Sequence, residues 1–152
     1  MKSEILVIDD NVDIRFLICN ILKEKDYIVR SAANFTQAEF EIKKKLPDLA
    51  IIDIKLDKGD RDGIELLKLI MKINKSIPTI MISGHANVQL AVEAIHLGAY
   101  EFLEKPFSTE KILNYVHRAL ESSFLKNEKD KLENKLFHSF DLIGESPEIL
   151  KI

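Results

Sequence analysis

The sequence is poor in residues that crosslink a chain or anchor it in a membrane. It contains no tryptophan and one cysteine, Cys19, which has no second thiol with which to form an internal disulfide. An oxidising compartment is therefore not indicated. No apolar run approaches the ~20 residues of a membrane span. The run Ile5–Ile8 is too short for a secretory signal and is followed at once by acids. We expect a soluble cytoplasmic protein without a membrane partner.

An excess of positive charge is also missing. Lysine and arginine number 22 against 25 aspartates and glutamates, and the net charge of −3 argues against a nucleic-acid-binding surface on this chain. No phosphate-cradling glycine loop follows the first apolar run, where the sequence reads Asp-Asp-Asn-Val-Asp. The four histidines have no metal-ligand spacing. A length of 152 residues with 46% hydrophobic content suits one domain with a modest extension.

Short apolar runs alternate with amphipathic stretches along most of the chain. Strands are predicted at 4–9, 27–32, 48–53, 78–83 and 100–104. These runs are mostly continuous and β-branched or aliphatic, as in parallel strands that are covered on both faces. Five such β/α units predict an α/β fold, a doubly wound five-stranded parallel sheet of the flavodoxin-like order 2-1-3-4-5.

Charged side chains stand where three of these strands end. Asp9 and Asp10 follow the first strand, Asp53 closes the third, and Lys105 follows the fifth. Because ligands bind beyond the carboxyl ends of parallel strands, three acids and one base should converge on one patch. All-oxygen ligation suits Mg²⁺, with Mn²⁺ as an alternative, and the lysine adds a point charge for a phosphoryl group. The simpler reading, that each aspartate is a cap or turn former, does not explain why all of them end apolar strands beside a matching lysine.

At this point the residues carry a resemblance. Residues 1 to about 122 resemble the receiver domains of two-component response regulators, through four segments: Ile5–Asp10, Leu49–Asp53, Ile82–His85 and Phe102–Phe107. The combined spacing is specific, although any one segment alone is not.

The resemblance implies roles for these residues. Asp53 would accept a phosphoryl group from a sensor histidine kinase, and Mg²⁺ would be held by Asp9, Asp10, Asp53 and the main-chain carbonyl of Lys55. Lys105 would contact the phosphoryl group and precede a cis peptide to Pro106. Ser83 and Phe102 would occupy the switch positions. Lys55 and His85 would be the side chains that modulate dephosphorylation.

The end of the chain narrows the resemblance to sigma-54-dependent activators of the NtrC/NtrX type. Residues 142–147 resemble the opening of their ATPase module, and the long loop after Asp53 is shared with NtrX-type receivers. The usual receiver loop is two residues shorter and has a proline where this chain has Asp57. We expect a receiver domain at 1–122, a helical linker at 123–140 and the truncated start of an ATPase domain at 141–152. DNA and sigma-54 RNA polymerase would then be partners only of absent C-terminal domains.

Two alternatives remain open at this stage. The charged run 125–136 is either a solvated helical linker or a dimerising helix with a seam of Leu125, Leu132 and Leu136. The resemblance implies a weak homodimer, because related regulators often dimerise through the fourth helix, fifth strand and fifth helix, and this seam would add to that face. The acid patch suits either a switch module that catalyses only its own phosphorylation and dephosphorylation, or a Mg²⁺-dependent phosphatase with an aspartyl nucleophile. The phosphatases of the haloacid-dehalogenase type place their acids as Asp-x-Asp, whereas Asp9 and Asp10 are adjacent, so the switch is favoured.

Overall fold

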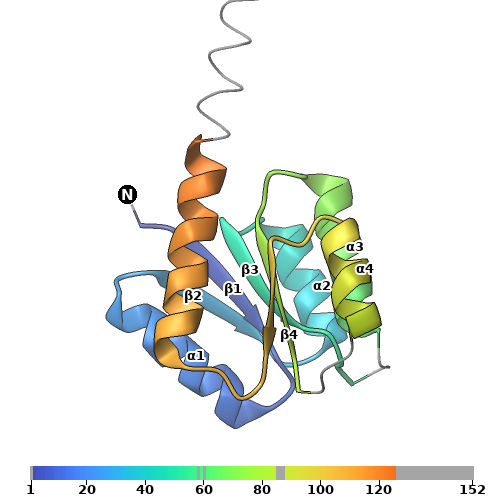
Figure 1. Cartoon of the computed structure of the whole chain (residues 1–152), viewed down its shortest axis with the longest axis horizontal. Helices are drawn as coiled ribbons and strands as arrows, with labels where there is room; N and C mark the ends of the chain where they lie inside the picture. Colours follow the sequence, from blue (N-terminus) through green and yellow to red (C-terminus); the bar gives the residue numbers. More distant parts are fainter. Residues whose placement is uncertain (1, 58, 60, 85–87, 126–152) are drawn as a thin grey trace, which may run out of the picture.

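A twisted five-stranded parallel sheet forms the centre of the molecule (Figure 1). The computed structural model describes residues 2–57, 59, 61–84 and 88–125. The strands lie in the order β2-β1-β3-β4-β5, which confirms the predicted topology. Their bounds are β1 Glu4–Ile8, β2 Ile28–Ala32, β3 Leu49–Asp53, β4 Thr79–Ser83 and β5 Glu101–Glu104.

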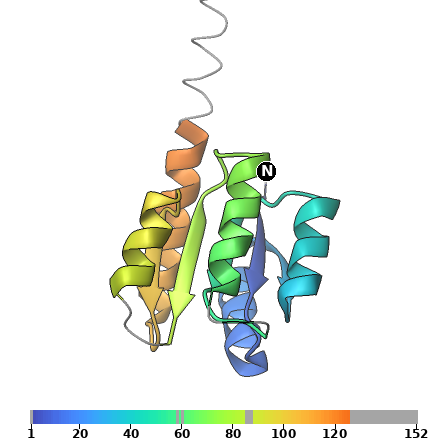
Figure 2. The ribbon, with the colours of Figure 1, turned by 90° about the vertical axis from the view of Figure 1, so that its right-hand side faces the viewer.

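Helices cover both faces of the sheet. Helix α1 and a helix at residues 109–125 lie on one face, and α2, α3 and α4 lie on the other, which Figure 2 turns toward the viewer. The bounds of the four labelled helices are α1 Val12–Glu24, α2 Phe35–Lys44, α3 Asp62–Ile73 and α4 Val88–His96. The helix at 109–125 passes position 122 without a break. The described residues contain no helix with the length and apolarity that crossing a membrane requires.

The two hydrophobic cores explain why the strands are apolar along their whole length. Along β1, Ile5 and Val7 pack against α1 and the helix at 109–125, whereas Leu6 and Ile8 pack against α2, α3 and α4. Successive side chains of a strand point to opposite faces, so a strand covered on both sides needs an apolar residue at every position. The result is a rigid sheet whose carboxyl ends can carry a site.

Local signals in the sequence begin and end the helices around that site. Asn11 caps α1 by accepting hydrogen bonds from Asp13 N and Ile14 N, at 2.9 and 3.1 Å. The chain leaves α4 at Gly98, whose φ of 116° lies in the region that favours glycine. A Cβ at this position would lie 2.7 Å from Met71 Sδ on α3, so the glycine also permits close packing of the two helices.

Candidate functional site

The charged residues predicted from the sequence meet at the carboxyl edge of the sheet. Ile8 of β1 pairs in register with Ile52 of β3, so Asp9 and Asp53 come next at the same level of neighbouring strands. Asp10 joins them: one carboxylate oxygen from each of the three aspartates lies within 4.8 Å of the others. The parallel register alone therefore assembles the cluster.

Lys105 reaches this cluster from β5. Its Nζ lies 2.9 Å from Asp53 Oδ2 and 3.1 Å from Asp9 Oδ2. Its backbone N donates to Ser83 O at 2.8 Å, which fixes the start of the loop after β5 to the end of β4. The Lys105-Pro106 peptide bond is cis, as the resemblance implied. The Lys105 ammonium group thus forms ion pairs with both carboxylates.

The neighbouring backbone holds the two buried carboxylates in place. Asp9 and Asp53 are 2% and 5% exposed, whereas Asp10 is exposed. Asn11 N donates to Asp9 Oδ1 at 2.9 Å, and Lys55 N donates to Asp53 Oδ1 at 3.2 Å. Each hydrogen bond joins residues two apart and closes a short turn just beyond the end of the strand. These turns fix the orientation of the two carboxylates.

Two further residues support the site, and the sequence analysis missed both. Arg15 Nη1 of α1 donates to Asp9 O at 2.8 Å. Gly63 N donates to Ile54 O at 2.7 Å, and a Cβ on Gly63 would lie 2.4 Å from Asp53 O. The absence of a side chain at Gly63 therefore lets the first turn of α3 rest directly on the backbone of Asp53.

Burial makes the ionised form of Asp53 costly. Desolvation, together with the charge of Asp9, raises the pKa of Asp53 from 3.8 to about 6, and the Lys105 ammonium offsets this only in part. Burial alone would lower the pKa of Lys105, but the bonds and charges of Asp53 and Asp9 raise it overall. The site therefore holds more negative charge than one lysine balances.

A divalent cation fits this arrangement. Asp9 Oδ2 is buried, and the Lys105 Nζ that lies 3.1 Å from it is shared with Asp53. Three carboxylates can supply oxygen ligands, and hard cations such as Mg²⁺ prefer oxygen. The negative charge that one shared ammonium group leaves uncompensated favours a cation beside Asp9.

The other predicted site residues lie around this edge. Ser83 is half-buried at the end of β4. Phe102 of β5 is partly buried and packs against the core beneath α4. The Lys55 side chain is exposed. His85 lies outside the described residues.

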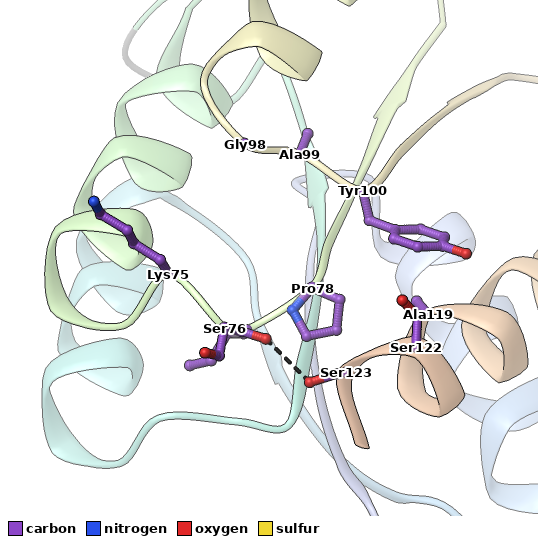
Figure 3. Close-up of a pocket in the computed structure, with 10 residues that line it drawn as sticks. Lys75, Ser76, Pro78, Gly98, Ala99, Tyr100, Ala119, Ser122 and Ser123 are labelled. Atoms are coloured by element: carbon purple, nitrogen blue, oxygen red, sulfur yellow. Dashed lines mark hydrogen bonds between the residues drawn. The ribbon is translucent and has the colours of Figure 1, made fainter. Parts of the chain in front are cut away.

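A cavity lies at the opposite edge of the sheet from the acid cluster (Figure 3). It is a cavity of about 290 Å³ lined by Ser76, Pro78, Tyr100 and Ser122, among others, and none of its lining residues is acidic. Ser123 Oγ donates to Ser76 O at 3.0 Å and ties the helix at 109–125 to the loop before β4. This cavity is therefore distinct from the acid cluster, which lies at the carboxyl edge.

Residues 5–117 match the family model described as "Response regulator receiver domain". The chain belongs to this family. Asp9, Asp53 and Lys105 all lie inside the matched range, so the fold, the acid cluster and the family agree on one edge of one domain.

The relatives also confirm the predicted NtrC/NtrX branch. The nitrogen assimilation regulatory protein NtrX of Azorhizobium caulinodans is 38% identical over the whole chain, which corresponds to 33% of that protein. The crystal structure of the receiver domain of NtrX from Brucella abortus is 43% identical, with a TM-score of 0.72 over 77% of this chain and 98% of that one. The solution structure of the beryllofluoride-activated NtrC4 receiver domain dimer is 36% identical, with a TM-score of 0.73 over 79% and 98%. The chain spans about a third of the length of the curated relatives that it matches.

The raised pKa of Asp53 predicts a pH-dependent stability in metal-free protein. Since the folded-state pKa exceeds the ordinary value of 3.8, the contribution of Asp53 to stability is complete below about pH 4 and is lost as the pH rises through about 6. Asp53→Asn should remove this loss. In EDTA, the variant should gain on the parent as the pH rises, up to about 1–3 kcal/mol at neutral pH after allowance for screening.

Urea unfolding between about pH 4 and 8 measures this difference. Mg²⁺ should narrow it by favouring the ionised carboxylate of the parent. Asp10→Asn, which removes a charge from an exposed member of the cluster, should gain less. If the difference in free energy of unfolding between Asp53→Asn and the parent stays constant across this pH range, burial does not raise the pKa of Asp53.

Proposed function

We propose that the chain is a phosphorylatable switch that accepts a phosphoryl group on Asp53 from the phosphohistidine of a sensor histidine kinase. The observation that carries this proposal is the placement of Asp53, whose Oδ2 lies 2.9 Å from Lys105 Nζ beside two further carboxylates. Phosphoryl transfer depends on positioning and charge neutralisation, which this cluster is built to provide. The P–N bond of the donor breaks and a P–O bond to Asp53 forms.

Asp53 suits the acceptor role better than its neighbours do. It ends β3, the central strand of the sheet, and its Oδ1 is already held by Lys55 N. Asp9 is buried more deeply, and Asp10 is exposed. Asp9, Asp10, Asp53 and the Lys55 carbonyl would hold Mg²⁺. A bound Mg²⁺ supplies positive charge that offsets the carboxylates and the incoming phosphoryl oxygens.

The residues around Asp53 would report its modification. A new dianion draws the Lys105 ammonium and the Ser83 hydroxyl toward it. Phe102 then turns inward behind Ser83, and α4 and β5 shift between two populations. Because phenylalanine has no hydroxyl, packing alone holds the inward position. Lys55 and His85 occupy the sequence positions whose side chains modulate dephosphorylation in receivers, and we infer the same role for them here.

A catalytic phosphatase is not favoured by the same site. Its acids are adjacent rather than spaced as Asp-x-Asp, and the chain belongs to a family of regulatory domains. The switch takes one phosphoryl group per chain and catalyses only its own phosphorylation and dephosphorylation.

In the parent protein this switch would control a sigma-54-dependent transcriptional activator in the cytoplasm. In this proposal the receiver spans 1–122, and the sequence prediction of a helical linker at 123–140 and the start of an ATPase domain at 141–152 is kept. Support comes from the similarity to NtrX along the whole chain and from the unbroken helix across position 122. Positions 126–152 lie outside the described residues. Contacts with DNA and sigma-54 RNA polymerase would belong to the remainder of the parent protein.

The acceptor assignment predicts the outcome of chemical phosphorylation. With acetyl phosphate and Mg²⁺, the chain should gain one phosphoryl group, because small acyl phosphates can replace the kinase when the acceptor site is preorganised. Asp53→Asn should abolish the gain, and Asp13→Asn, on the exposed first turn of α1, should leave it intact. Intact-mass spectrometry measures the stoichiometry. Full labelling of Asp53→Asn, or repeated turnover of a generic phosphate ester, would exclude the proposal.

The exposed apolar residues of α4, of the segment before β5 and of the helix at 109–125 predict a weak homodimer. Val92, Ile95 and Tyr100 are exposed, as are Phe124 and Leu125 near the last described turn. Deleting 123–152 should weaken self-association several-fold, because it removes part of this apolar surface. Sedimentation equilibrium with and without beryllofluoride measures the effect. A strict monomer at high micromolar concentration in both states would refute it.

A further inference from the structure

Few buried side chains hold α4 on the sheet. Of the nine residues of α4, only Ala94 is fully buried, whereas the twelve residues of α3 include six buried ones. Val88, Val92 and Ile95 are 74%, 48% and 46% exposed. Since burial of apolar area is the main force that fixes a helix, packing holds α4 more weakly than α3.

A two-pronged ion pair links this loosely packed helix to the loop that follows Asp53. Arg61 Nη1 donates to Glu93 Oε1 at 2.8 Å, and Arg61 Nη2 donates to Glu93 Oε2. Arg61 stands immediately before α3, and Glu93 lies in the middle of α4. Paired bonds between a guanidinium and a carboxylate fix geometry better than a single contact does.

The described part of this loop is itself fixed to its surroundings. Asp57 Oδ1 accepts a hydrogen bond from Phe35 N, at the start of α2, at 2.9 Å. Asp62 Oδ2 accepts from Gly59 N at 3.0 Å, and Gly63 N donates to Ile54 O beside Asp53. Asp57 is the residue that replaces the usual proline in this longer loop. Hydrogen bonds therefore hold the loop that carries Arg61, so a structural change at Asp53 can be transmitted to α4 through the Arg61 side chain.

We propose that the Arg61–Glu93 pair is a latch that holds α4 in its resting position in the unmodified protein. Its release contributes to the switch, and that second role depends on the proposed phosphorylation of Asp53. Glu65 and Lys68 form their own ion pair at 3.2 Å. The charge of Glu65 helps to raise the pKa of Arg61, and the charge of Lys68 helps to lower the pKa of Glu93. They offer alternative partners when the latch opens.

Hydrogen exchange in the unmodified protein tests the latch directly. Arg61→Gln and Glu93→Gln should each speed exchange of the amides of residues 92–97 by about two- to five-fold, the range for an exposed pair. The reversed pair, Arg61→Glu with Glu93→Arg, should restore much of the protection. Glu39→Gln, which breaks an exposed pair with Lys43 on α2, is the matched control and should leave α4 unchanged.

A beryllofluoride titration with Mg²⁺ tests the coupling. The single variants should reach half-conversion at a concentration lower by a similar factor, because less free energy opposes the movement of α4. Normal labelling of Asp53 together with parental exchange in both single variants would overturn the latch. A parent that neither labels on Asp53 nor responds to beryllofluoride would overturn the proposed function while leaving the exchange result to judge the latch alone.

Discussion

The repulsion between the carboxylates of Asp9 and Asp53 is the constraint on which this edge of the molecule depends. Both side chains are buried, and one ammonium group, from Lys105, lies within 3.1 Å of each. Burial and the nearby charge of Asp9 raise the pKa of Asp53 to about 6, so this carboxyl keeps its proton to a higher pH than an ordinary aspartate does. The fold keeps them together only because their strands are locked in register within an apolar sheet. That forced proximity favours a cation beside these carboxylates.

Rigidity and freedom are divided between elements of the same edge. The central strands β1, β3 and β4 are almost wholly buried and fix the positions of the acids. Helix α4 and strand β5 contribute fewer buried residues and lie on the side of Lys105 and Phe102. Less buried apolar area therefore holds α4 and β5 than holds the central strands on which the acids stand.

The sequence was sufficient to predict the elements that depend on pattern. All five strands begin and end within a residue of the predicted bounds, because continuous apolar runs between turn formers have few alternatives. The convergence of Asp9, Asp53 and Lys105 followed from one rule about parallel strands.

Contacts that depend on tertiary distances were not predictable in this way. The bond from Arg15 to the Asp9 carbonyl, the packing of Gly63 on Asp53 and the pair between Arg61 and Glu93 join residues by no fixed sequence spacing. The sequence shows that Asp57 departs from the usual loop. It does not show the hydrogen bond from Phe35 N to Asp57, because that bond forms only when α2 packs beside the loop after β3.

A crystal structure of the chain with Mg²⁺ and beryllofluoride tests the central claim most directly. The account predicts the beryllium on an Asp53 oxygen, with Lys105 and Ser83 contacting its fluorides. It also predicts a cation held by Asp9, Asp10 and Asp53. Beryllofluoride bound at another carboxylate, or a cation remote from these aspartates, would contradict it.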